Sequence, residues 1–189
     1  IQNECNIQHE NNLFQYIKPK IFFLKGSANA SLKNLSDSIT DYENVYNCFI
    51  NNMKTCLNDI DSIYYVLNSL LFVSRIQNHY FEKNESYIKN VERVLDIWKR
   101  MEESCKIDTL KEVYIKFLNE FIILTIKDDV KDQFDQAINC TNECIKYNEK
   151  EIDFYAYRIA LYQRRTIEIE NQIESLMKEN KVDESKNYV

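Results

Sequence analysis

A single glycine, Gly26, and a single proline, Pro19, occur in this chain of 189 residues. An all-β fold needs a turn about every 8 to 12 residues, and glycine and proline supply much of that turn chemistry. Two such residues are far too few for a sandwich or a barrel. Hydrophobic residues make up 44% of the chain, which is enough to fill the core of one compact domain or of two small ones. The sequence therefore predicts an all-α protein.

Charge and hydropathy exclude two classes of partner. Lys and Arg number 24 against 30 Asp and Glu, so the formal net charge is −6, and the basic residues are dispersed among acidic ones. Binding to nucleic acid or to an anionic membrane needs clustered Lys and Arg. The longest apolar run, Tyr64–Val73, is interrupted by Asn68 and Ser69 and is too short to span about 30 Å of hydrocarbon. We expect a soluble protein that binds neither nucleic acid nor a membrane.

The cysteine content predicts a secreted protein. An even number of cysteines in a small chain is typical of a disulfide framework formed in an oxidising compartment. The chain starts at Ile1 without a methionine, as expected after removal of a signal peptide. We therefore expect extracellular localisation and three structural disulfides, formed by Cys5, Cys48, Cys56, Cys105, Cys140 and Cys144.

Four N-x-Ser/Thr triplets are compatible with the same secretory route, because such triplets are acceptors for N-glycosylation. A chain rich in asparagine also produces them by chance. The possible glycosylation sites are Asn29, Asn34, Asn84 and Asn139.

Helix boundaries have to be inferred from polar clusters and caps, because helix-breaking residues are so rare. A first helix is expected over about 7–25, bent or broken at Pro19 and stopped by Gly26. A long stretch with helical periodicity and without glycine or proline follows over 31–83. The remaining helices are predicted at about 84–104, 106–127 and 130–180, with a polar, frayed tail from 182.

The predicted helix over 130–180 has apolar residues at alternating steps of three and four. This is the a/d pattern of a heptad repeat, and it predicts a long helix that packs along another helix at a shallow angle. We call these positions the heptad stripe: Ile152, Tyr155, Ile159, Tyr162, Thr166, Ile169, Ile173 and Leu176. The equivalent positions 92 residues earlier hold Ile60, Ile63, Leu67, Leu70 and Ser74.

Two similar sequence segments indicate an internal duplication. Cys5 and Cys105 are each followed by a Tyr-Ile-Lys triplet and then by an apolar run. The tyrosines of the two triplets are Tyr16 and Tyr114. The alternative is chance similarity between two helical hairpins in a chain rich in Ile, Asn and Lys.

The later cysteines support the duplication. The offset of 92 residues aligns Cys48 with Cys140, while Cys56 and Cys144 differ from each other in position by one helical turn. We predict two tandem disulfide-stapled units, each a short helix, a turn and a long helix with two cysteines near its first third. The predicted division is 1–83 for the first unit, 84–104 for a connector helix, 105–181 for the second unit and 182–189 for a disordered tail.

The connectivity of the cysteines cannot be deduced from spacing alone, because six cysteines allow many pairings. A bridge between Cys140 and Cys144 is disfavoured, since the rigid spacing of a regular helix resists the geometry that a disulfide requires. Symmetry between the two units favours Cys5 with Cys48, Cys105 with Cys140, and Cys56 with Cys144.

No arrangement of residues points to catalysis. His9 and His79 lie in polar contexts and are expected at the surface, and the cysteines are expected in disulfides rather than as nucleophiles. A metal site would need close cysteine or histidine pairs, and only the spacing of Cys140 and Cys144 comes near that. A single glycine cannot form a phosphate-binding loop. We predict that the chain is not an enzyme and holds no metal and no cofactor.

Aromatic residues are numerous, with 13 tyrosines and 10 phenylalanines. Core packing is the expected role of most of them. A second interpretation is an interaction surface on the last helix, where Arg158, Arg164 and Arg165 could flank the tyrosines. Ion pairing of these arginines with acids along the helix is the simpler role.

The two Cys…Tyr…Cys units built on Tyr16 and Tyr114 resemble those of the bicycle proteins. These form a large, fast-diverging family of aphid salivary-gland proteins, named for paired cysteine-tyrosine-cysteine motifs. The resemblance implies a secreted effector that is delivered into plant tissue, is linked to gall development and acts by non-catalytic binding to host components; the partner expected is an unknown host protein of the plant. The residues that match as framework are Cys5, Tyr16 and Cys48 in the first unit and Cys105, Tyr114 and Cys140 in the second, with Cys56 and Cys144 as additional cysteines.

Two other classes stay open at this point. A secreted helical carrier would hold a small apolar ligand between the two units, as insect odorant-binding-like proteins do, although their usual cysteine spacing is not matched here. A secreted or surface adhesion protein of an AT-rich parasite would share this composition. The sequence identifies neither the host target nor the oligomeric state.

Overall fold

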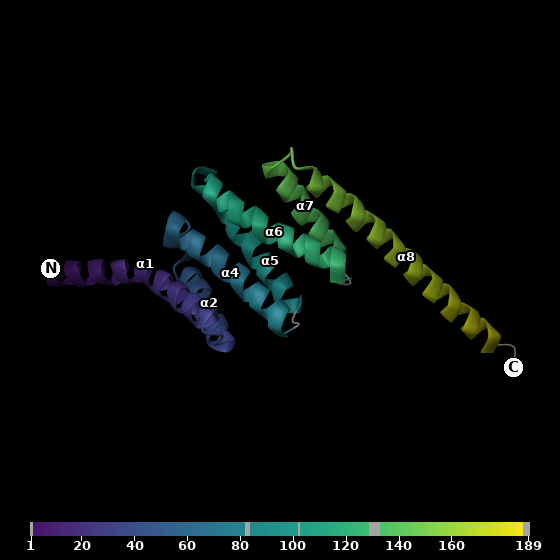
Figure 1. Ribbon diagram of the computed structural model, residues 1–189, viewed down its shortest axis with the longest axis horizontal. Coiled ribbons are helices and arrows are strands. Elements are labelled where there is room, and N and C mark those ends of the chain that lie inside the picture. The colour runs from purple at the N-terminus through teal and green to yellow at the C-terminus, as the bar shows by residue number, and fades with distance from the viewer. Residues whose placement is uncertain (1, 82–83, 102, 129–132, 187–189) are drawn as a thin grey trace. The chain divides into compact units, whose positions relative to one another are not determined.

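The computed structural model describes residues 2–81, 84–101, 103–128 and 133–186. Within these ranges every regular element is a helix, so the predicted all-α class is confirmed. None of the helices in these ranges is long and apolar enough to cross a membrane. In chain order they are α1 (Gln2–Ser31), α2 (Leu35–Asn51), α3 (Met53–Cys56), α4 (Ile60–Phe81), α5 (Asn84–Arg100), the short 3-10 helix η1 (Glu103–Cys105), α6 (Asp108–Asp128), α7 (Phe134–Tyr147) and α8 (Ile152–Lys186) (Figure 1).

The chain divides into two compact units, Ile1–Phe117 and Leu118–Val189, so the boundary between them falls inside α6. In the first unit α1, α2 and α4 pack against one another, and α5 packs on α4. In the second unit α7 and α8 lie side by side (Figure 1). The predicted divisions at 83, 104 and 181 stay predictions, as does the internal duplication.

Gly26 lies inside α1 and does not end it, so the prediction that the helix stops there is wrong. The physical reason is packing. Gly26 is buried beneath the ring of Tyr42 in α2, and a Cβ atom at position 26 would lie 2.9 Å from two carbons of that ring. The glycine therefore permits a close approach of α1 and α2. The helix also continues through Pro19, and its axis changes direction partway along (Figure 1).

Gly26→Ala is expected to lower the free energy of unfolding by about 1 to 3 kcal/mol, because the new methyl group meets the buried Tyr42 ring. In an unobstructed helix the same change would raise the free energy of unfolding by up to about 1 kcal/mol, since alanine is the better helix former. Urea unfolding followed by circular dichroism measures the difference. In a Tyr42→Leu background the penalty should shrink or change sign. A penalty of unchanged size in that background would contradict the packing role of Gly26.

α1 ends in a capped turn that contains a lysine where a glycine is usual. Lys33 has a φ of 62°, in the left-handed region. The backbone N–H of Asn34 donates to the carbonyl of Asn29 at 2.9 Å, and that of Lys33 donates to the carbonyl of Ala30 at 3.0 Å. These two bonds are those of a Schellman motif. The left-handed residue that follows a helix is usually a glycine, and here it is Lys33. The sequence therefore contains no signal at the true end of α1, and the end was predicted too early, at Gly26.

The predicted helix over 31–83 is wrong as a single element, because polar side chains divide it into α2, α3 and α4. The Asn52 side chain donates to the carbonyl oxygen of Cys48 at 3.0 Å, in the last turn of α2. The Asp59 carboxylate accepts a hydrogen bond of 3.0 Å from the backbone N–H of Ser62 and so caps the start of α4. Asn and Asp compete with the helical backbone for hydrogen bonds in this way. In this chain, with its single glycine and single proline, such polar side chains therefore end and begin helices.

The predicted single helix over 130–180 is also wrong. α7 ends before Asn148, which leaves the helical conformation at φ −146° and ψ 65° while its N–H still donates to the carbonyl of Cys144 at 2.9 Å. Cys140 and Cys144 therefore lie on α7, and the heptad stripe lies on α8. The predicted unit of one short and one long helix is corrected accordingly: the cysteines and the stripe belong to separate helices.

Three principal helices lie on either side of α5 in the chain: α1, α2 and α4 precede it, and α6, α7 and α8 follow. α4 and α8 begin at Ile60 and Ile152, which differ by the offset of 92 noted in the sequence. The helices predicted over 84–104 and 106–127 correspond closely to α5 and α6. α8 continues to Lys186, beyond the predicted end near 180, and the last three residues of the predicted tail lie outside the described residues.

Aromatic side chains hold α1, α2 and α4 together. The ring of Phe23 on α1 lies 5.7 Å from that of Tyr42 on α2 and 5.2 Å from that of Tyr65 on α4, measured between centroids. Tyr42 also stacks on Phe72 of α4 at 5.5 Å. Such ring pairs stabilise a core by about 0.5 to 1.5 kcal/mol each beyond the burial of their area. These four aromatics therefore act as framework.

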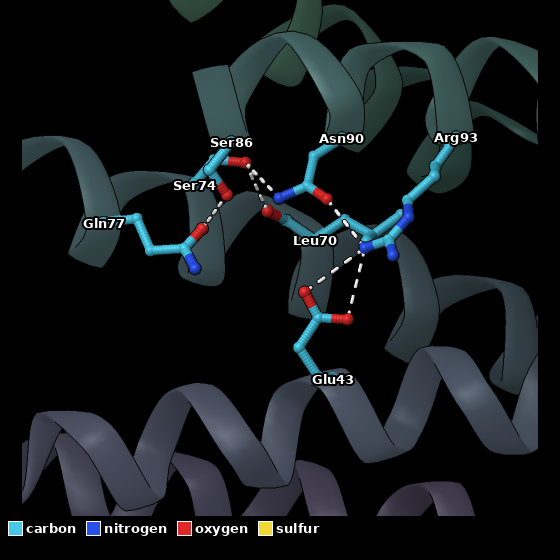
Figure 2. Close-up of polar contacts among 7 residues, drawn as sticks. All are labelled: Glu43, Leu70, Ser74, Gln77, Ser86, Asn90 and Arg93. Carbon is cyan, nitrogen blue, oxygen red and sulfur yellow. Dashed lines mark hydrogen bonds and ion pairs between the residues drawn. The ribbon is translucent and has the colours of Figure 1, made fainter. Parts of the chain in front are cut away.

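A buried polar network attaches α5 to α4 and α2 (Figure 2). Asn90 Nδ2 donates to Ser74 Oγ at 3.0 Å, and the Ser74 hydroxyl donates to the carbonyl of Leu70 at 2.8 Å. Arg93 Nη1 donates to Asn90 Oδ1 at 2.9 Å and to both carboxylate oxygens of Glu43 at 3.2 Å. Asn90 and Ser74 are both buried. Because each bond has a fixed direction, the network sets the register of α5 on α4.

Asn90→Ala is expected to lower the free energy of unfolding by about 1 to 3 kcal/mol, because it removes two hydrogen bonds and leaves polar groups without their buried partner. Chemical denaturation of the full chain measures the change. Lys89→Ala, one residue earlier on α5 and exposed, is the matched control and should change stability by less than about 0.5 kcal/mol. Equal effects of the two substitutions would show that the network contributes nothing.

Candidate interaction surface

One face of α8 packs on α7. Phe154 and Leu161 are buried on this face. Arg165 forms an ion pair with Asp135 of α7 on the same side. These contacts position α8 on α7.

The heptad stripe lies on a different face of α8, roughly a third of a turn around the helix from Phe154 and Leu161. All eight of its side chains are exposed, with Ile152 at 78%, Ile159 at 58% and Leu176 at 59%. α8 does pack along another helix, α7, as predicted, but it does so through the face of Phe154 and Leu161 and not through the heptad stripe. The stripe is a surface.

The corresponding positions on α4 have the opposite exposure. α4 packs against α2 and α5. The hydroxyls of Ser74 on α4 and Thr166 on α8 make the same local bond, each donating to the carbonyl four residues earlier, at 2.8 and 2.9 Å. One sequence pattern is thus core in the first unit and surface in the second. On α4 the buried positions are Ile63, Leu67, Leu70 and Ser74, and the first residue of the helix, Ile60, is exposed.

The structure contains thiols rather than a disulfide at four of the predicted disulfide cysteines. Cys105 is half-buried in η1, and the side chain of Cys5 lies outside the described residues. None of the three predicted pairings is formed, and the disulfides therefore stay a proposal. The four thiols are Cys48, Cys56, Cys140 and Cys144.

Burial keeps these thiols protonated. It raises the pKa of Cys140, with the neighbouring Cys144 and Glu143 adding to the shift, and it raises the pKa of Cys144 to about 12. Burial also raises the pKa of Cys56; a hydrogen bond with Ser62 opposes the shift, and the nearby carboxylate of Asp59 adds to it. A protonated, buried thiol is a poor nucleophile. The geometry therefore supports a framework role for these cysteines over a catalytic one.

Tyr114, one of the two repeat tyrosines, is a core residue. It is 1% exposed, and its ring stacks on that of Trp98 of α5, with centroids 4.1 Å apart and planes 5° apart. This position agrees with a framework role for the tyrosine. The side chain of its counterpart, Tyr16, lies outside the described residues.

The possible glycosylation sites differ in their surroundings. Asn34 and Asn139 are exposed. Asn29 is half-buried and its Nδ2 donates to the buried carboxylate of Asp41 at 2.8 Å, so a glycan there would disrupt this bond. The side chain of Asn84 lies outside the described residues. Asn34, in the turn between α1 and α2, has the surroundings that glycosylation needs.

The two histidines are the remaining positions singled out in the sequence. His79 is exposed with its ring 4.8 Å from that of Tyr80, and the side chain of His9 is outside the described residues. In the part of the chain that the structure describes, no group of three or more His, Cys, Asp or Glu residues could hold a metal ion. The absence of catalysis, metal and cofactor stays a prediction. The candidate site is therefore the heptad stripe of α8.

Comparison of the chain with protein-family models, with curated proteins and with solved structures finds no match in any of the three.

Proposed function

We propose that this chain is a secreted salivary effector of the bicycle type, which a plant-feeding insect delivers into plant tissue and which is linked to gall development. It acts by binding host proteins and not by catalysis. The resemblance of the two Cys…Tyr…Cys units supports the biological context. The observation that carries the binding role is the exposed heptad stripe of α8. Exposed apolar rows bordered by polar side chains mark interaction sites, and tyrosines such as Tyr155 and Tyr162 are enriched in them.

The secreted form of the protein carries three disulfides, with Cys5 bonded to Cys48, Cys105 to Cys140, and Cys56 to Cys144. Peptide mapping without reduction, on protein secreted from eukaryotic cells, tests this pairing. A peptide in which Cys140 is bonded to Cys144 would contradict it, and so would one in which Cys48 is bonded to Cys56. Recovery of six free thiols would remove the extracellular assignment itself.

The biological context is tested by locating the transcript. Expression confined to the salivary gland of a plant-feeding insect is the expected result. Expression in a parasite of animals would contradict the proposal and favour an adhesion protein.

The binding role is tested with purified disulfide-bonded protein as bait in plant extract, followed by titration against the purified protein that it captures. Ile159→Glu/Ile173→Glu, which places two charges on the heptad stripe, should weaken this binding by about tenfold or more. Ile167→Glu is the matched control, because Ile167 is 56% exposed on α8 but lies outside the stripe. A bound terpenoid or lipid in native mass spectra, together with no captured protein, would favour an apolar carrier.

A further inference from the structure

We propose that the heptad stripe of α8 binds the same stripe on a second copy of this chain, and that the two α8 helices form a parallel, two-stranded coiled coil. This inference rests on the proposed function only in treating α8 as a protein-binding surface. The stripe runs for about 36 Å from Ile152 to Leu176, at a rise of 1.5 Å per residue. A pattern sustained over this many heptads, and exposed along its whole length, is typical of a coiled-coil seam.

The residue types suit a two-stranded seam. With Ile152 at a heptad position a, the other a positions are Ile159, Thr166 and Ile173, so every a residue is β-branched. β-branched residues at a are those that parallel dimers favour. The d positions hold Tyr155, Tyr162, Ile169 and Leu176. The tyrosine rings at d can pack across the seam while their hydroxyls reach water at its edge.

Charge selects a second copy in the parallel orientation. In a parallel pair each g residue faces the e residue of the next heptad on the other helix. Arg165 is at g and Glu170 is at e, so the two chains form two symmetrical pairs of opposite charge. In the antiparallel register that aligns the full stripe, Arg165 instead faces Arg165 of the other copy. The stripe is therefore complementary to itself in one orientation and repulsive in the other.

The existing contact of Arg165 does not block this arrangement. Its ion pair with Asp135 lies at the surface, where the side chain of Arg165 is 41% exposed and that of Asp135 is 66% exposed. A guanidinium has five N–H donors and can bind two carboxylates at once. Glu170 is exposed on the other edge of the stripe. Arg165 can therefore keep its ion pair with Asp135 and also donate hydrogen bonds to the carboxylate of Glu170 on the second copy.

In the first unit, the same heptad spacing on α4 is covered by neighbouring helices. On α4 the corresponding residues are buried by helices, and α5 makes the hydrogen bond from Asn90 to Ser74 across that contact (Figure 2). On α8 the position that corresponds to Ser74 is Thr166, which is exposed. A helix laid along the heptad stripe would bury α8 as α5 buries α4.

The test is the molar mass of the full, disulfide-bonded chain by light scattering and sedimentation equilibrium over a wide range of concentrations. We expect twice the chain mass of 22.7 kDa for the natural sequence. Ile159→Glu/Ile173→Glu should raise the dissociation constant of the dimer by about a hundredfold or more. Ile167→Glu should leave it unchanged, because Ile167 is exposed outside the stripe. Circular dichroism at the same concentrations confirms that each variant is folded.

A charge exchange tests the orientation. Arg165→Glu and Glu170→Arg should each weaken the dimer by about tenfold, because each places like charges opposite one another in the parallel pair. The double variant Arg165→Glu/Glu170→Arg should recover most of the lost affinity. Failure of the double variant to recover would overturn the parallel arrangement.

The outcomes separate this inference from the proposed function. A monomer at all concentrations, or a trimer, overturns the two-stranded coiled coil even if α8 still captures a plant protein. A dimer that the stripe variants dissociate supports the coiled coil even if no plant protein is captured. A dimer that survives Ile159→Glu/Ile173→Glu places the interface elsewhere and overturns the inference.

Discussion

Tyr114→Ala is expected to lower the free energy of unfolding by about 3 to 5 kcal/mol, as large aromatic deletions in a core do. Tyr114 is 1% exposed, and its ring lies flat against that of Trp98, so its removal leaves a cavity and an indole ring without its stacking partner. Urea unfolding of the full chain, followed by circular dichroism and by tryptophan fluorescence, measures the loss. The single tryptophan of the chain reports directly on this contact.

Two control substitutions separate the ring of Tyr114 from its hydroxyl and from its residue type. Tyr114→Phe keeps the stacked ring and should cost no more than about 1.5 kcal/mol. Tyr80→Ala removes a tyrosine that is 60% exposed and should change stability by less than about 0.5 kcal/mol. If Tyr114→Ala costs no more than Tyr80→Ala, the repeat tyrosine is not framework, and it becomes a candidate contact residue instead.

The reduced protein is expected to lose stability steeply above about pH 9. Burial raises the pKa of Cys140 and of Cys144 in the folded chain, the latter to about 12, whereas a thiol in an unfolded chain titrates near 8.5. Below the unfolded pKa both states are protonated, and the contribution of the buried thiols is fully present. As the pH rises through the window between the two pKa values, the unfolded chain releases protons first. Each thiol then costs about 1.4 kcal/mol of stability per pH unit.

Disulfide-bonded protein is the control for this pH dependence, because sulfurs in a disulfide do not titrate. Denaturant unfolding across the alkaline range should give a steeper loss for the reduced sample than for the oxidised one. Cys140→Ala/Cys144→Ala should reduce the slope of the reduced sample toward that of the oxidised sample. Equal slopes for the reduced chain and this variant would show that the two thiols are not held neutral in the fold.

Helix identity could be predicted where one apolar face is covered and the opposite face is charged. α5 is the clearest case, since Val91, Val94 and Trp98 recur at helical spacing and all three are buried. Helix ends could not be predicted in the same way. The end of α1 depends on Lys33 in a left-handed conformation, and the start of α4 depends on the Asp59 side chain. Asn and Asp are so frequent in this chain that their presence alone does not show which ones act as caps.

Gly26 shows a second limit of local reasoning. A lone glycine near the end of an apolar run is a normal signal for a helix end. Its role here depends on the Tyr42 ring, which is contributed by another helix. No property of the residues next to Gly26 in the chain indicates that contact.

The sequence showed the heptad spacing of the candidate site, but it did not show that these side chains are exposed. The heptad stripe of α8 and its counterpart on α4 have the same spacing, and only packing makes one exposed and the other buried. A signal for two partners was nevertheless present. Phe154 and Leu161 are apolar and lie off the stripe, so α8 has two apolar faces. Two apolar faces fit a helix with two neighbours, and α7 covers one of the two faces.

Beyond Glu168 every side chain of α8 that the structure describes, from 169 to 178, is exposed. A helical segment without a tertiary partner is held by its intrinsic propensity alone, and in water that is marginal. If the heptad stripe pairs with itself, order in this segment follows mass action, and it rises with the amount of protein present. For the salivary effector proposed above, release from a gland into tissue would take the protein through such a range of concentration in one step. Dilution would then open this end of α8 to proteases and to new binding partners at the moment of delivery.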